Sequence, residues 1–175
     1  VAGVDYEDID RISRGFASDG GPRRYFFPDE GRETVGVYAD LTARLLDDRL
    51  IVNGGVRQDR IESSLKATPL RPDFVPDSTT TTTTNPRAGL VFYPFSDRRL
   101  RLHASAGRGF VVPDVREVAG STDSVRNGQR RVSRGNPDLD PESSVSVDVG
   151  IGYSGDNWGA DLTWFRTDID DKIES

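Results

Sequence analysis

The sequence predicts an all-β fold in which about seven antiparallel strands run up and down as a fragment of a transmembrane β-barrel. Apolar and polar residues alternate with a period of two in seven short segments, which is typical of strands. Short and long connections alternate strictly between these segments. No run of about 18 apolar residues is present, so no membrane-spanning helix is predicted.

The amino-acid composition excludes several classes of protein. Of 175 residues, 34% are hydrophobic and 30% are charged, and 18 glycines with 10 prolines favour many short elements over a few long helices. Cysteine is absent, which excludes a disulfide framework and a thiolate metal site. The formal net charge of −6 argues against a nucleic-acid partner.

The alternation is clearest over residues 35–45, where every odd position from Val35 to Leu45 is apolar. The even positions carry polar side chains such as Asp40 and Arg44. Successive side chains of a strand point to opposite faces, so this segment would have one apolar and one polar face. The same alternation recurs in segments beginning near residues 2, 50, 87, 99, 144 and 158.

The register of these segments predicts which residues share a face. The face expected to contact lipid carries Val37, Leu41, Leu102, Val147, Ile151 and Leu162. The opposite face, expected to line a wet lumen, carries Asp40, Arg44, Arg101, His103, Asp148 and Asp161.

The connections predict the topology. Tight turns are expected at residues 46–49, 95–98 and 154–157, which are rich in Asp, Asn, Ser and Gly. Long connections are expected over residues 10–32, 61–85 and 108–141, and the threonine run at 79–84 predicts a mobile loop crest. Strands of about 9–11 residues, short periplasmic turns and long extracellular loops are the layout of outer-membrane barrels.

A soluble β-sandwich, as a binding or adhesion module, is the alternative, because its strands also alternate and its polar face is solvated. The barrel is favoured because charge hardly interrupts the apolar face, and because Tyr153 and Trp158 flank a tight turn as an interfacial aromatic belt would. A requirement for detergent would separate the two. No enzyme is predicted: His103 is the only histidine, so no catalytic residue, cofactor or metal site emerges.

Four segments carry a family resemblance. Residues 102–117 are similar to a strand followed by a "GFRAP" box, residues 135–142 to a "GNPxLxPE" box, and residues 85–92 and 164–173 to the strands around them. In this order they resemble TonB-dependent outer-membrane receptors, whereas residues 1–84 carry no signature. The resemblance implies a structural role for these motif residues: Phe110, Pro113, Asn136, Pro137, Leu139, Pro141 and Glu142.

The resemblance implies a 22-stranded barrel in the outer membrane of a bacterial cell, with a plug domain folded inside it. Such receptors take up a scarce nutrient, here expected to be a ferric siderophore or similar metal chelate, with energy from the TonB complex of the inner membrane. Residues 1–175 are all expected to belong to the barrel domain, with the plug, the closing strands and the N-terminal part that contacts TonB outside this segment. Lipid and lipopolysaccharide are the implied surroundings.

The departures from the family pattern bear on the ligand. Val111 and Val112 stand in the middle of the "FRAP" box, so its arginine is replaced. Haem-specific relatives place a histidine between that box and the Asn-Pro box, and no histidine lies between Pro113 and Asn136. Haem is therefore disfavoured.

Two clusters are candidate ligand contacts. The first, in the first long loop, consists of Arg23, Arg24, Tyr25, Phe26 and Phe27, and would grip an anionic aromatic ligand by charge and cation–π contact. The alternative is that the loop packs these aromatics against itself.

The second cluster lies in the third long loop and includes Arg130 and Arg131. It would bind an anionic ligand or the phosphates of lipopolysaccharide. A solvated loop surface is the alternative.

Overall fold

The computed structural model describes residues 1–12, 14–23, 27–71, 75–118, 121–134, 136 and 139–170, with the backbone alone at 116, 121–124, 126 and 130–134. The elements along the chain are β1 (Ala2–Arg11), β2 (Gly15–Phe16), β3 (Pro22–Arg23), β4 (Asp29–Leu45), β5 (Leu50–Lys66), β6 (Asp77–Phe92), β7 (Leu100–Val111), α1 (Val115–Val118), β8 (Ser121–Arg126), β9 (Gln129–Arg134), β10 (Glu142–Ser154) and β11 (Gly159–Asp170).

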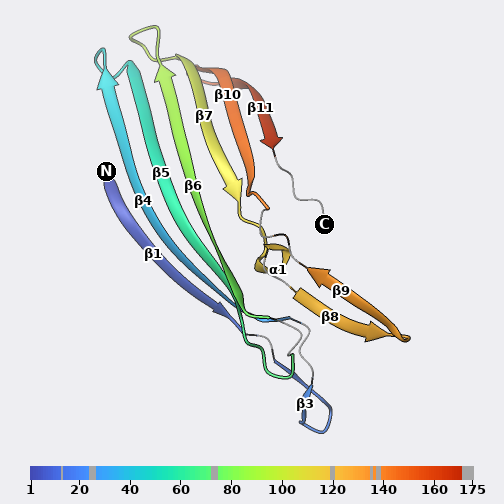
Figure 1. Cartoon of the computed structure of the whole chain (residues 1–175). Coiled ribbons are helices and arrows are strands. Elements are labelled where there is room, and N and C mark those ends of the chain that lie inside the picture. The colour runs from blue at the N-terminus through green and yellow to red at the C-terminus, as the bar shows by residue number, and fades with distance from the viewer. Residues whose placement is uncertain are drawn as a thin grey trace.

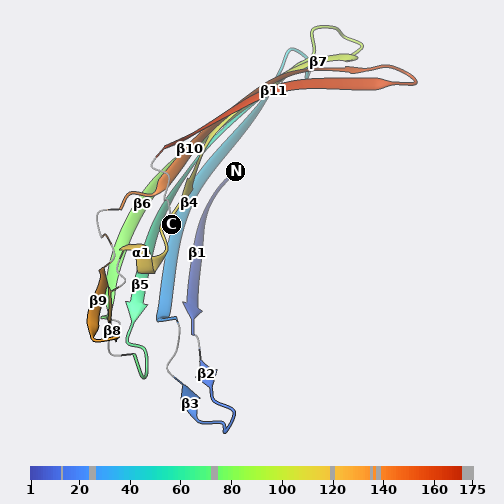
Figure 2. The same cartoon turned by 90° about the vertical axis from the view of Figure 1, so that its right-hand side faces the viewer.

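Seven strands form one antiparallel sheet in the order β1-β4-β5-β6-β7-β10-β11. Each strand pairs with the next of the seven along the chain, as the alternating connections predict, and the sheet is curved rather than flat (Figures 1 and 2). The predicted topology is confirmed: the described residues form one main sheet, not the two packed sheets of a sandwich. The strands β1 and β11 are its edges.

The first tight turn is formed as predicted. It occupies residues 46–49 between β4 and β5, and Leu46, Asp47 and Asp48 all have positive φ, between 56° and 61°. Aspartate tolerates this left-handed region better than most residues, which explains the pair of aspartates here. The other two tight connections run from 93 to 99 and from 155 to 158, so the second is longer than expected.

The predicted facing is also confirmed. Leu102 lies opposite Ile151, and Ile151 lies opposite Leu162, so one apolar row crosses three strands. The next row places His103 opposite Gly150 on the other face. Because the side-chain period is two, a slip of one residue would have exchanged the faces throughout. The polar face is called the inner face below.

The expected strand length was wrong for β4, β5 and β6. β4 and β5 each span 17 residues and β6 spans 16, well beyond the 9–11 that cross a membrane. The threonine run at 79–84, expected as a loop crest, lies within β6 and pairs with residues 58–63 of β5. The physical reason is that threonine is β-branched, which suits a strand irrespective of sequence complexity.

The outer face changes polarity along these long strands. From the tight turns to Val35 on β4 and to Val56 on β5 the outer face is apolar, and further from the tight turns it carries charged residues such as Glu33 and Glu62, which lie opposite one another. The inner face is polar near the tight turns and mixed further along, where Ile61 is only 6% exposed but Arg32 and Ser63 also face inward. This change is what a wall with lipid outside one part and water outside the other would show.

The long connections contain small elements that were not predicted. β2 pairs with β3 and β8 pairs with β9, the latter around Asn127 and Gly128 with φ of 53° and 74°. An Asn-Gly pair with positive φ at both positions is the usual two-residue hairpin turn, so this signal was present in the sequence.

The single turn of α1 folds onto the inner face of the extended strands. Val115 and Val118 of this turn are 4% and 5% exposed, and on β5 Ile61 and Leu65 are also buried. Leu65 and Val115 share a small apolar core. In the described part of the chain, no helix is long and apolar enough to span a membrane.

Candidate functional site: the polar inner face

Glycines on the inner face make room for long polar side chains that lie flat across the neighbouring strand. Gly55 faces Asp40 in the register, and Gly150 faces His103. A Cβ at either glycine would overlap the side chain opposite. The wall therefore holds its charged groups against the sheet instead of projecting them into the space it surrounds.

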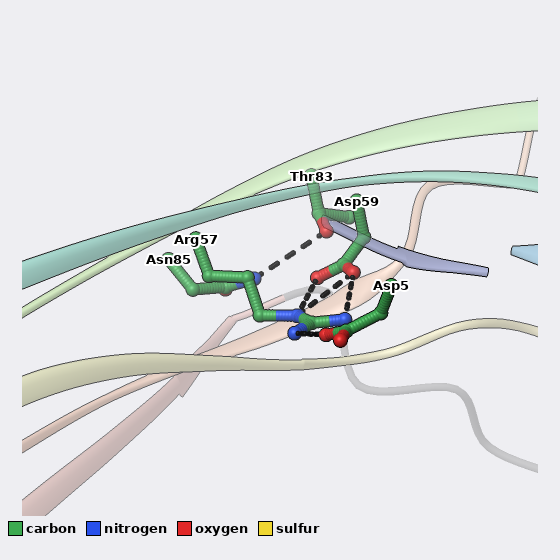
Figure 3. A network of polar contacts seen from close by, with 5 residues as sticks. All are labelled: Asp5, Arg57, Asp59, Thr83 and Asn85. Atoms are coloured by element: carbon green, nitrogen blue, oxygen red, sulfur yellow. Dashed lines mark hydrogen bonds and ion pairs between the residues drawn. The ribbon is translucent and has the colours of Figure 1, made fainter. Parts of the chain in front are cut away.

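Three groups of polar contacts follow one another along the wall. The upper network, the one nearest the long connections (toward the bottom of Figure 1), is centred on Arg57 (Figure 3). Its Nη1 donates to Asp5 Oδ2 at 2.5 Å, and its Nε donates to Asp59 Oδ1 and Oδ2 at 2.9 and 3.0 Å. The guanidinium carbon also lies 5.9 Å from the ring centre of Tyr38. The Asp59 side chain is only 5% exposed, whereas that of Asp5 is 52% exposed. Two carboxylates on one guanidinium leave this network with a formal charge of −1.

A middle pair joins Arg87 to Asp40. The Nε and Nη2 atoms of Arg87 donate to the same carboxylate oxygen, Asp40 Oδ1, at 3.0 and 2.7 Å. The two residues lie on β6 and β4, so the pair spans β5, and Gly55 is the residue between them in the register.

The lower network is the one nearest the tight turns, which lie at the top of Figure 1. Arg101 Nη2 donates to Asp161 Oδ2 at 2.5 Å, and His103 Nε2 lies 3.2 Å from Asp161 Oδ1. Ser105 donates to Asp148, the other carboxylate of this half of the wall. His103 thus lies beside the carboxylate of Asp161 on the inner face, the face predicted for both residues.

The wall can present fixed charge and hydrogen-bond capacity to an aqueous interior, and the charges are partly balanced within the wall. Ion pairs that lie flat between neighbouring strands also resist changes in the register. Among the described residues, no group of three or more His, Asp or Glu side chains is placed to hold a metal ion.

Further ion pairs tie together the end of the wall beyond the change in polarity of the outer face. Arg14 binds Asp29 through two nitrogens at 2.5 and 2.7 Å, and the backbone N–H of Asp29 donates to Thr68 Oγ1 at 2.7 Å. On the outer face, Lys66 donates to Asp10 across β4. This hydrogen bond raises the pKa of the Lys66 ammonium above its ordinary value of 10.5.

The first candidate ligand cluster is placed only in part. Arg23 and Phe27 are both exposed, at the end of β3 and shortly before β4, whereas Arg24, Tyr25 and Phe26 lie outside the described residues. The gripping of an anionic aromatic ligand by this cluster stays a prediction.

In the second cluster, Arg130 and Arg131 lie on β9, opposite Val125 and Ser124 of β8. Their side chains are outside the described part, so the roles suggested for them also stay predictions.

The two family motifs lie at the beginning and the end of the third long connection, between β7 and β10. Phe110 lies near the end of β7 and Pro113 is buried just before α1. The backbone N–H of Asn136 donates to the carbonyl of Glu117 at 2.7 Å, so the second motif returns against the first.

The rest of the second motif leads into β10. The backbone N–H of Leu139 donates to the carbonyl of Asn136 at 3.2 Å, and after Pro141 the strand begins at Glu142. Pro137 lies outside the described residues.

The sequence did not indicate the upper network or the middle pair. Arg57, Asp59 and Arg87 were not singled out: Arg57 and Asp59 lie two residues apart on β5, but the partners Asp5 of Arg57 and Asp40 of Arg87 are remote in the chain. The glycines opposite large polar residues were a usable signal, but only once the register was known.

The chain matches a known family over its whole length. The family model described as "TonB dependent receptor-like, beta-barrel" matches residues 1–175. The chain is 43% identical over 42 residues to the Ferrienterobactin receptor of Escherichia coli (strain K12), which is 24% of this chain and 6% of that protein. It is 50% identical over 44 residues to the Probable TonB-dependent siderophore receptor PirA of Acinetobacter baumannii, covering 25% and 6%.

A solved structure, the Copper transporter OprC, superposes with a TM-score of 0.66 at 18% identity, covering 95% of this chain and 27% of that one. At this identity the likeness concerns the fold alone. The curated relatives are matched over only 6% of their length, and the superposition covers about a quarter of the solved chain.

Proposed function

Because the chain belongs to the TonB-dependent receptor β-barrel family of the outer membrane, we propose that it is part of a receptor that takes up a ferric siderophore or a similar metal chelate. The TonB complex of the inner membrane would supply the energy. The family consists of transport receptors and not of enzymes, and no residue is assigned a catalytic role.

The observation that carries the proposal is the two-faced wall. The outer face is apolar through the stretch that would contact lipid, whereas the inner face carries ion pairs laid flat across glycines. A sheet of this kind suits a wide barrel whose interior is wet and occupied by a polar domain. The ligand class rests on the names of the relatives, two of which are siderophore receptors.

In this proposal residues 1–175 supply seven of 22 strands, and a plug domain fills the barrel beside them. The upper network, with its formal charge of −1, and Asp148, which accepts a hydrogen bond from the neutral Ser105, are two places where the wall is negative. A plug that presents arginine or lysine at these heights would complement the wall.

The test is uptake by the full-length receptor in a bacterial strain that lacks its own siderophore receptors. We expect radioactive iron to accumulate from ferric enterobactin or from ferric citrate, and accumulation to disappear when TonB is deleted. Haem and a copper salt serve as parallel substrates. Uptake of haem or copper alone, or iron uptake that persists without TonB, would contradict the proposal.

A further inference from the structure

We infer that the β8–β9 hairpin docks onto β6, with β8 added as a further strand along an edge of β6 that β7 leaves unpaired. The inference goes beyond the proposed function and does not depend on it, because it concerns the packing of this chain alone. In the structure the hairpin forms a separate two-stranded sheet that lies apart from β6 (Figure 1). The docked arrangement is a second position of the same hairpin.

The wall splits between β6 and β7 part of the way along their length. The two strands pair as far as Arg87 and Gly107, whereas β6 continues to Asp77 with β5 as its partner. Pro86 explains where the pairing ends, because it would lie opposite Arg108 and has no N–H to donate across the split. Beyond this point β6 and β7 diverge (Figure 1).

The unpaired edge of β6 carries the backbone groups of Thr80, Thr82 and Thr84. The N–H of Tyr93 donates to the carbonyl of Arg49 at 2.7 Å, so the odd-numbered residues of β6 point their backbone groups toward β5. The even-numbered ones point into the split. All three threonines are exposed, and within the described part of the chain their N–H and C=O groups have no partner on that side. Such a row is a template for another strand, and no lysine or proline interrupts it between 78 and 84.

The strand β8 has a matching free edge. The hairpin turn lies at residues 127–128, so the even-numbered residues of β8 pair through their backbone groups with β9. The backbone groups of Asp123 and Val125 point to the other side, where a third strand can pair with them. β8 spans six residues, a length that fits the open stretch of β6 between 78 and 84.

The short link to α1 keeps the hairpin close to the open edge. α1 contacts both β5 and β6, and its last residue, Val118, is buried. β8 begins at Ser121, so the Cα atoms of these two residues are at most about 11 Å apart. The docked position therefore requires no change in α1 or in the main sheet.

The charges of the two parts are complementary. Between residues 121 and 134 the hairpin carries four arginines and one aspartate. On the outer face beside the open edge, Glu62 lies opposite Thr80, and Glu33 lies opposite Glu62. A basic hairpin next to β6 would offset the repulsion between these two carboxylates. This complementarity favours the hairpin over a neutral or acidic strand from another molecule.

Disulfide trapping in the full-length receptor tests the docking, in outer-membrane vesicles and with no other cysteine in the protein. Asp123→Cys is combined in turn with Thr80→Cys, Thr82→Cys and Thr84→Cys, and Glu33→Cys on the same face of β4 is the matched control partner. Docking places one of the three threonine positions directly opposite residue 123, within reach of a disulfide. We expect that pair to form its disulfide at least about fivefold faster than the control pair. Equal rates for all four pairs, or disulfides only between two receptor molecules, would overturn the inference.

Amide hydrogen exchange gives a second readout that needs no cysteine. Replacement of residues 122–133 by a short Gly-Ser linker removes the hairpin and leaves the main sheet in place. We expect the amides of Thr80, Thr82 and Thr84 to exchange about tenfold faster or more in this variant, because docking protects them. The amide of Val147, on a strand paired on both sides, is the internal control and should not change. Unchanged exchange at the three threonines would overturn the docking.

Discussion

At the scale of single residues, the ion pairs of the inner face depend on glycines, because each glycine leaves space for the polar side chain on the neighbouring strand. Gly36 lies between Asp5 and Asp59 in the register, so the space where its side chain would stand is taken by the Arg57–Asp59 pair. Facing is readable from alternation alone, and His103 and Asp161 were assigned to the right face. Their contact was not predictable, because it spans Gly150 on the strand between them.

Two adjacent glycines test this arrangement. Gly55 faces inward against Asp40, whereas Gly54 faces outward, and a Cβ added to Gly54 would have as its nearest neighbour the carbonyl oxygen of Arg87 at 3.9 Å. We expect Gly55→Val to displace Asp40 from Arg87 and to destabilise the receptor by about 1–3 kcal/mol. Gly54→Val should be neutral or stabilising. Urea unfolding of the full-length receptor in lipid vesicles measures both, and equal effects would contradict the assignment.

The Lys66–Asp10 contact predicts a pH dependence. The pKa of Lys66 is raised in the folded state by the hydrogen bond to Asp10. Its contribution to stability is therefore fully present below 10.5, the ordinary pKa, and is lost as pH rises through the raised value. The melting temperatures of wild type and Lys66→Met should differ at about pH 8 and converge at strongly alkaline pH. A constant difference would show that the ammonium charge is not involved.

At the scale of elements, the change from an apolar to a charged outer face within β4, β5 and β6 predicts the height of the membrane. The sequence predicted these strands from their lipid-facing halves, where apolar residues alternate. It did not predict their upper halves, because there the outer face meets water and the apolar residues Ile61 and Leu65 turn to α1. The alternation of apolar and polar residues therefore did not show how far β4, β5 and β6 extend, because it carries no information on the packing of α1 against them.

An arginine introduced on the outer face should destabilise the receptor in the lipid-facing half of the wall and not in the half beyond it. Val149 lies in the middle of β10, opposite Ala104 and Trp164, on the lipid-facing half. Thr80 lies on the same face of β6, opposite Glu62, beyond the change in polarity. We expect Val149→Arg to cost about 2–4 kcal/mol and Thr80→Arg less than about 0.5 kcal/mol, measured by unfolding in vesicles. A large cost at Thr80 would place the membrane higher on the wall.

At the scale of the whole molecule, the sheet has two open edges, β1 and β11, and an apolar face without a partner layer. Leu41, Leu162 and Trp158 are 74%, 72% and 63% exposed in the isolated sheet. Open edges are not tolerated in lipid, and an exposed apolar face is not tolerated in water. In a closed barrel, neighbouring strands and lipid satisfy both.

Residues 1–175 expressed alone should therefore aggregate into inclusion bodies and resist refolding as a monomer. Size-exclusion chromatography without detergent is the measurement, and the full-length receptor refolded in detergent is the control. A soluble monomer that melts cooperatively would contradict the barrel and restore the β-sandwich.

The most direct test of the lipid-facing wall compares two neighbouring residues. Val147 lies opposite Ala106 on the apolar face, and Asp148 lies opposite Ser105 on the inner face. A fluorescent label attached at Val147→Cys or at Asp148→Cys of the full-length receptor, in vesicles with brominated lipid, reports which side meets hydrocarbon. A wall with lipid on its apolar face predicts strong quenching at position 147 and little at 148. Equal quenching, or stronger quenching at 148, would contradict it.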